Sequence, residues 1–346
     1  MIRSRLRRSD SRRSTLRPSH SRRARMFLRS MFRSRMALAA ISMGLLLAGC
    51  GHQDRIVYGD GGAAEEDRAK GSQTSSRASS SAGSRAMEYV YSSTASLNWD
   101  IIREEDPSTF LCLHYRGMEH REMWDKRVRQ EFFHPVFLFD AYFSDGTRFE
   151  IHVNPEFGSD MEAEREAFRY VRPLGQLPTR LRRGIGSFGI HDGMPTTSAG
   201  GRKIFFYRQN AIKRQVQKHL EESLFYAAAN VSLVNDFMDD PLWKAAQEQD
   251  GKFLTRHGRN GPERSDIAES ALLVWGLLRY PERISKSHRA RIEAAAPNRI
   301  AYLRNELPVS GPIFELPPGK NRPLTLDDMP YGCVYSLGDR SRIHLL

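Results

Sequence analysis

Four polar residues recur along the segment 211–235 at spacings that could place them together. His219, Glu222, Tyr226 and Asn230 follow one another at steps of three, four and four. On a helix such steps bring side chains onto one face, here about 100° from the apolar face of the same segment. Imidazole, carboxyl and phenol groups on one face could bind a metal ion or a polar ligand.

His219 and Glu222 belong to a segment that nearly matches a zinc-binding motif. Residues 219–223 read HLEES, one residue short of the inverted H-x-x-E-H motif, because Ser223 stands where the second His should be. A zinc site that recruits His191, His257 and Glu269 is one hypothesis. The alternatives are an exposed pair of His219 and Glu222, worth a few tenths of a kcal/mol, with His191 in a turn and His257 in a solvated loop.

Chemistry without a metal has weaker support. Ser223 and Ser232 could serve as nucleophiles, but neither lies in a G-x-S-x-G turn, and a serine on a helix more often packs or caps. Asp266 and Glu269 are three residues apart on one predicted helix, where the dipole at its N-terminus would stabilise Asp266. The glycine-rich turn 200–201 lacks the Lys-Ser of a phosphate-binding loop.

The elements that must position these residues follow from apolar periodicity. Apolar residues at steps of three and four predict one long helix over 211–235 with a core face, formed by Ile212, Val216, Leu220, Leu224, Ala227 or Ala228, Val231 and Val234. Alternation and turn signals predict strands at 110–115, 136–154 (a hairpin turning at 145–146), 185–191 and 203–207. Further helices are predicted at 161–172, 241–249, 265–279, 286–295 and 297–305. Strands followed by helices indicate an α+β domain.

The segment 219–236 resembles the site helix of a family of uncharacterised bacterial zincin-like proteins. That helix reads approximately L-E-E-x-x-x-H-E-A-x-H-x-S-L-D, and residues 220–222 and 232–233 match it. The resemblance covers roughly residues 104–308, with further ordered motifs at 106–110 (DPSTF), 123–127 (MWDKR), 153–157 (VNPEF), 175–178 (GQLP) and 266–270 (DIAES). It implies a zincin-like metallopeptidase fold.

The same resemblance places this chain's departures at the metal site. Tyr226, Ala227 and Asn230 stand where the family has His, Glu and His, and Glu269 stands at the later Glu. In H-E-x-x-H the histidines bind Zn²⁺ and the Glu is the general base. The resemblance therefore implies a pseudoenzyme without a cofactor, acting as a binding module for a peptide or protein ligand in the former cleft. The alternative is a metallopeptidase with an unconventional zinc site.

The N-terminal part has the order of a bacterial lipoprotein leader. Arginines precede an uncharged run of 13 residues, 36–48, which is too short to span a bilayer. The run ends in Leu47-Ala48-Gly49-Cys50, which resembles a lipobox, so residues 1–49 are interpreted as a leader and Cys50 as the lipidated residue. Because Gly51 rather than Asp follows, this resemblance favours the outer membrane of the cell envelope, with the bilayer as a partner through Cys50.

The formal net charge of +12 lies entirely in that leader. Residues 1–35 contain 13 of the 53 basic residues and one of the 41 acidic residues, so the remainder is neutral and offers no argument for a nucleic-acid partner. Residues 50–86, with a Gly/Ser-rich stretch from 59, are interpreted as a flexible tether, and residues 87–346 as one domain. Cys112 and Cys333 could be bonded or could be buried thiols.

Overall fold

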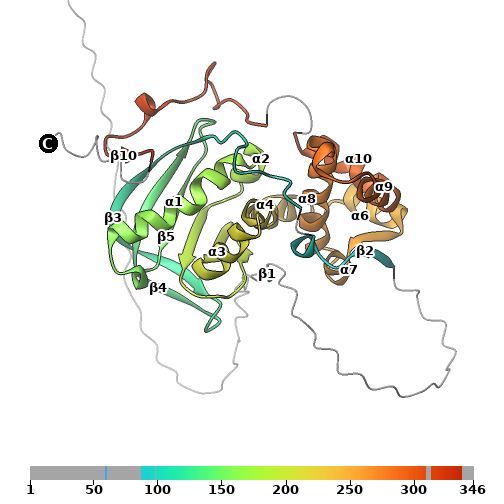
Figure 1. Cartoon of the computed structure of the whole chain (residues 1–346), viewed down its shortest axis with the longest axis horizontal. Coiled ribbons are helices and arrows are strands. Elements are labelled where there is room, and N and C mark those ends of the chain that lie inside the picture. Colours follow the sequence, from blue (N-terminus) through green and yellow to red (C-terminus); the bar gives the residue numbers. More distant parts are fainter. Residues whose placement is uncertain (1–58, 61–86, 98, 309–312, 337–346) are drawn as a thin grey trace, which may run out of the picture. The chain divides into compact units, whose positions relative to one another are not determined.

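The computed structural model describes residues 59–60, 87–97, 99–308 and 313–336. Its main sheet has the strand order β1-β7-β8-β6-β5-β4-β3-β10 (Figure 1). The bounds are β1 Gly59–Asp60, β3 Phe110–Asp125, β4 Gln130–Phe143, β5 Arg148–Val153, β6 Ser187–His191, β7 Ser198–Gly200, β8 Lys203–Tyr207 and β10 Cys333–Val334. The predicted leader 1–49, Cys50 and the tether, apart from β1, lie outside the described residues.

The sheet combines two kinds of pairing. Strands β3, β4 and β5 form an antiparallel meander, whereas β5, β6 and β8 pair in parallel. Strands β7 and β8 form a hairpin whose two loop residues, Gly201 and Arg202, both have positive φ. The edge beyond β7 is taken by β1, where Gly59 and Asp60 pair antiparallel with Ala199 and Ser198.

Helices cover one face of this sheet and continue as a helical part of the chain. Figure 1 shows α1 (Asp160–Gln176) lying across the strands, with α4 beside it and α8 next to α4. The other helices are α2 Thr179–Arg182, α3 Arg208–Val216, α4 Leu220–Val231, α5 Leu233–Phe237, α6 Pro241–Asp250, α7 Arg256–Asn260, α8 Ser265–Arg279, α9 Lys286–Ala295 and α10 Pro297–Glu306. A parallel pair, β2 (Glu88–Tyr91) and β9 (Lys252–Thr255), packs among them.

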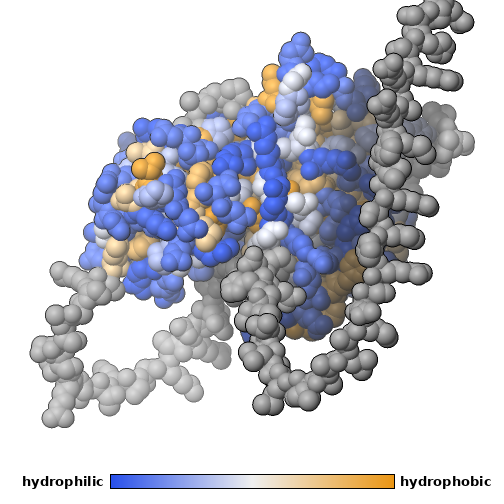
Figure 2. Space-filling view, turned by 180° about the vertical axis from the view of Figure 1, so that it is seen from behind, coloured by the Kyte–Doolittle hydropathy of each residue, from blue (hydrophilic) through white to orange (hydrophobic). Residues whose placement is uncertain are grey.

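The observed elements confirm the predicted α+β composition. Strand β8 and helices α8 and α9 have the predicted bounds, and the predicted hairpin turns at Gly146, whose φ is +79°. Glycine suits that position because it adopts positive φ without strain. On the face seen in Figure 2, hydrophilic residues predominate among those described, and hydrophobic residues are scattered between them.

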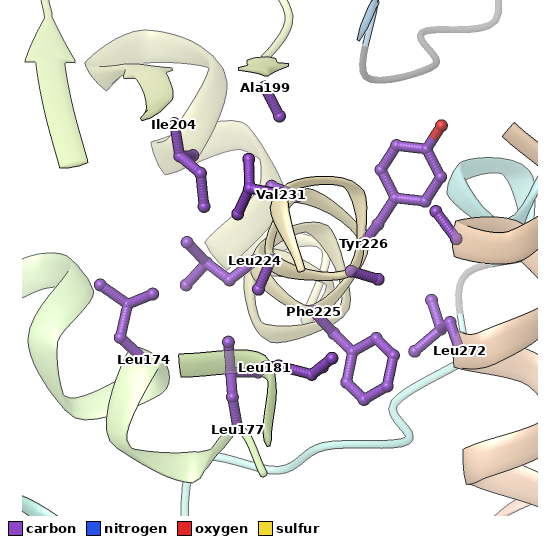
Figure 3. Packing of buried hydrophobic residues seen from close by; sticks show 14 of the residues in the cluster. Leu174, Leu177, Leu181, Ala199, Ile204, Leu224, Phe225, Tyr226, Val231 and Leu272 are labelled. Carbon is purple, nitrogen blue, oxygen red and sulfur yellow. The ribbon is translucent and has the colours of Figure 1, made fainter. Parts of the chain in front are cut away.

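The prediction of one helix over 211–235 is wrong. The chain forms α3, α4 and α5 instead, and Lys218, with φ of +52°, turns the chain between α3 and α4. The apolar stripe is therefore interrupted: Ile212 and Val216 on α3 are exposed, whereas Leu224 and Val231 on α4 are buried in the core (Figure 3). The core face predicted for the segment holds only from Leu220 onward.

A disulfide settles the alternatives left open for two cysteines. Cys112 of β3 is bonded to Cys333 of β10, with 5.6 Å between their Cα atoms. The bond joins positions 221 residues apart and holds the short strand β10 against the edge of the sheet. Within the described part of the chain, no helix is long and apolar enough to cross a membrane.

Candidate binding pocket

A small polar pocket lies where α4 and α8 meet the segment around Thr94. Its volume is about 30 Å³. Buried residues form its floor, namely Thr94, His219, Glu222, Tyr226 and Glu269, and half-buried residues form its mouth, including Thr196, Asn210, Arg214 and Ser223. Three of the four residues of the predicted polar stripe therefore come together in one cavity, joined by Glu269.

Glu222 is fixed by backbone groups far away in sequence. It lies in the first turn of α4 and is 1% exposed. Its Oε1 atom accepts hydrogen bonds from the N–H groups of Ile101 at 2.6 Å and Ile102 at 2.8 Å. Burial raises the pKa of Glu222 to about 8, although these N–H groups favour the charged form. The carboxyl therefore binds the segment 101–102 to α4 and is largely protonated at pH 7.

His219 faces the second oxygen of Glu222. It precedes the first turn of α4, and its Nδ1 atom is 3.6 Å from Oε2 of Glu222. Both atoms are buried and have no hydrogen-bond partner among the described residues. Burial lowers the pKa of His219 to about 4, with a further lowering from the positive charge of Arg214. The expectation of an exposed His219–Glu222 pair is therefore wrong, because both side chains are enclosed.

Glu269 enters the pocket from α8. Its Oε2 atom accepts a hydrogen bond of 2.7 Å from the Thr94 N–H, and the Thr255 side chain is a second partner. Burial raises the pKa of Glu269 to about 7 despite these bonds. The carboxyl thus joins α8 to the segment at Thr94, in the same way that Glu222 joins α4 to residues 101–102.

Tyr226, Ala227 and Asn230, the other positions that the resemblance singled out, differ from one another in burial and contacts. Figure 3 shows the Tyr226 ring directed away from Leu224 and Val231, with its hydroxyl at the far end. The ring centroids of Tyr226 and His257 are 6.4 Å apart. Ala227 is completely buried, and Asn230 donates from its Nδ2 atom to the Tyr226 carbonyl at 2.9 Å. Asn230 does not line the pocket.

The other candidates do not meet in the pocket as a ligand set. His191 is buried at the end of β6, where its ring contacts Asn154 and the Trp124 carbonyl, so it is not the turn residue expected. His257 is half-buried in α7 rather than in a solvated loop. In the part of the chain that the structure describes, no group of three or more His, Cys, Asp or Glu residues could hold a metal ion.

The candidate nucleophiles have structural contacts. Ser223 and Ser232 donate through their hydroxyls to carbonyls four residues earlier, those of His219 and Ala228, both at 2.7 Å. Such bonds are common for serine within helices. Asp266 does not pair with Glu269, because both of its oxygens accept from Arg299 at 2.9 Å. Ser223, Ser232 and Asp266 therefore each have a structural role in these contacts.

Sequence reasoning missed Arg214 and the threonines of the pocket. Arg214 belongs to α3, which was expected to continue into α4, so its position over His219 depends on the turn at Lys218. Thr94 lies about 125 residues before α4 and carries no motif. Comparison with known proteins gave no matching family model, curated protein or solved structure.

Proposed function

We propose that this chain is a lipid-anchored protein of the cell envelope. Its domain would be zincin-like without a working metal site, and would bind an extended peptide or protein segment. Cys50 would hold it in the bilayer, with the outer membrane favoured. The domain would act without a cofactor and without peptidase activity.

The observation that carries the proposal is the use of Glu269. This residue stands at the position of a metal-binding Glu in the resembled family, yet its carboxyl is engaged by the Thr94 N–H and the Thr255 side chain. Asn230, at a second ligand position, bonds to the backbone of its own helix. Groups that hold neighbouring segments in place in this way support a binding scaffold rather than a metal centre.

Pairing at the edge of the main sheet supports an extended ligand. Strand β7 accepts Gly59–Asp60 as an antiparallel neighbour, and Thr196 and Thr197, just before β7, line the pocket. Addition of a strand to a sheet edge is a common mode of peptide recognition. An extended segment of a partner could pair with β7 in place of β1 and extend a side chain or chain end toward the pocket.

The role of Tyr226 gives the test of this proposal. Tyr226 is 9% exposed, so Tyr226→Ala would cost about 3–5 kcal/mol through lost packing alone and would not separate binding from folding. Tyr226→Phe removes only the hydroxyl. Peptides are first selected from a random displayed library against the full-length chain in detergent, and their affinities are then measured by fluorescence anisotropy.

We expect Tyr226→Phe to weaken a selected peptide about tenfold, as loss of one hydrogen bond worth about 1.4 kcal/mol would do. Tyr331→Phe, a half-exposed tyrosine outside the pocket, is the matched control and should bind as the parent chain does. If no peptide is selected, or if both variants bind equally well, the pocket is not the site of peptide recognition and the proposal fails.

A further inference from the structure

Arg214 is the positively charged group at the mouth of the pocket. It is half-buried, and its Nη1 atom donates to the Ala95 carbonyl at 3.3 Å. Among the described residues, no carboxylate pairs with its guanidinium, and burial lowers the pKa of Arg214 without any opposing carboxylate. A guanidinium keeps its charge at any physiological pH and has five N–H donors, so Arg214 has donors available for a further acceptor.

The carboxyl groups of the pocket do not neutralise Arg214. Burial raises the pKa of Glu222 to about 8 and that of Glu269 to about 7, so at pH 6 both are largely protonated. Burial lowers the pKa of His219 to about 4, so its imidazole is neutral at that pH. Of the residues that line the pocket, Arg214 therefore carries the positive charge at pH 6. The Lys126 ammonium lies nearby and donates to the hydroxyl of the lining residue Thr196 at 2.6 Å.

The floor of the pocket contains two buried polar atoms without a hydrogen-bond partner among the described residues. Oε2 of Glu222 and Nδ1 of His219 are buried, line the pocket and make no hydrogen bond within the described structure. The cavity of about 30 Å³ exceeds the roughly 10–15 Å³ that one water requires. Two adjacent oxygen atoms, such as those of a carboxylate, therefore match the available space.

The pocket combines a guanidinium that has no carboxylate partner among the described residues, enclosed hydrogen-bonding groups and space for two oxygens. We infer that it binds a carboxylate, namely the free C-terminal carboxylate of an extended peptide. The inference rests on the proposed function, because it names the group that such a peptide would present. Arg214 would hold one carboxylate oxygen through a charge-assisted hydrogen bond, and the protonated Glu222 would donate to the other.

Two measurements on the full-length chain test this inference. The first uses acetate alone: modification of Arg214 by phenylglyoxal is followed by mass spectrometry in acetate and in chloride at equal ionic strength. Acetate should slow the modification of Arg214 several-fold and leave that of the exposed Arg202 unchanged. Equal rates of Arg214 modification in the two salts would overturn the inference, independently of any result with peptides.

The second measurement compares a selected peptide with its C-terminally amidated form. Amidation should weaken binding at least tenfold, and Arg214→Gln should weaken the free-acid peptide by a similar factor without changing the affinity of the amide. Lys213→Gln, at an exposed neighbouring position of α3, should leave both affinities unchanged. Equal affinities of the free-acid and amidated peptides would overturn the carboxylate inference and leave peptide binding itself intact. If acetate protects Arg214 but no peptide is selected, the proposed function fails instead.

Discussion

Helix α8 carries two buried carboxylic acids, Asp266 and Glu269, whose surroundings differ sharply. Asp266 accepts two hydrogen bonds from Arg299, which also binds Asp250, and all three side chains are fully enclosed. Glu269, three residues later, faces the pocket and has no positively charged partner among the described residues. The first arrangement joins α6, α8 and α10, whereas the second leaves a polar cavity between helices.

The comparison separates two uses of buried polar residues. A buried charge is tolerated when an opposite charge and hydrogen bonds compensate for the loss of water, as they do at Arg299. Without an opposite charge, burial raises the pKa of a carboxyl group so that it becomes neutral near pH 7, as at Glu222 and Glu269. The paired cluster compensates its buried charges within the fold, whereas the pocket keeps its two carboxyl groups largely neutral without an opposite charge.

The largest effect is expected at the paired cluster. Arg299→Leu would leave Asp250 and Asp266 buried without their cation, and we expect the free energy of unfolding to fall by about 3–5 kcal/mol. Chemical denaturation of the full-length chain measures this change. Arg304→Leu, at an exposed position of the same helix, should change it by less than about 0.5 kcal/mol. A loss below about 1 kcal/mol for Arg299→Leu would show that the two clusters do not differ as described.

A smaller loss is expected at Glu222. Glu222→Ala removes the acceptor for the N–H groups of Ile101 and Ile102, and each buried donor left unpaired costs about 1–3 kcal/mol. We expect a loss of about 2–4 kcal/mol. In Glu222→Gln the amide oxygen can still accept both bonds, and its NH₂ group can donate to Nδ1 of His219. This variant should therefore stay within about 1 kcal/mol of the parent, and an equal loss in both variants would contradict the protonated state assigned to Glu222.

The smallest effect is a dependence of stability on pH. In the pocket the pKa of Glu222 is about 8 and that of Glu269 about 7, both above the unfolded value near 4.5, so the folded chain holds more protons and loses stability as pH rises through this range. The lowered pKa of His219, about 4, has the opposite effect only below about pH 6.5. From pH 6.5 to 8 we expect a net loss of about 1–2 kcal/mol, measured by denaturation at each pH. Glu222→Gln should remove most of it, and an unchanged slope in that variant would place the responsible group elsewhere.

Sequence patterns predicted the elements whose signals are local. Strand β8 and helices α8 and α9 follow from alternation or helical periodicity within the element, and the turn at Gly146 from its Asp-Gly pair. The break between α3 and α4 could not be predicted, because Lys218 adopts positive φ without a glycine or proline signal. The hairpin joining β3 to β4 was missed for a similar reason, since Arg129 supplies its positive φ.

The candidate site was predicted in part. The helical spacing of His219, Glu222 and Tyr226 correctly indicated one shared location, and Glu269 joins them. Their burial could not be predicted, because the groups that enclose and fix them come from Thr94, Ile101 and Ile102, more than 100 residues away in sequence. Arg214 was likewise missed, since its place at the pocket mouth depends on the turn that separates α3 from α4.

The zinc content of the full-length chain, purified in detergent without chelator, tests the central claim most directly. It is measured beside the variant Tyr226→His/Asn230→His, which leaves the fully buried Ala227 unchanged. The account predicts less than about a tenth of a zinc per chain in both. Glu269 stays held by the Thr94 N–H and the Thr255 side chain, and position 230 does not line the pocket, so the three ligands that a zinc site needs do not converge. About one zinc in the parent chain would contradict the account and restore the alternative of a metallopeptidase with an unconventional site.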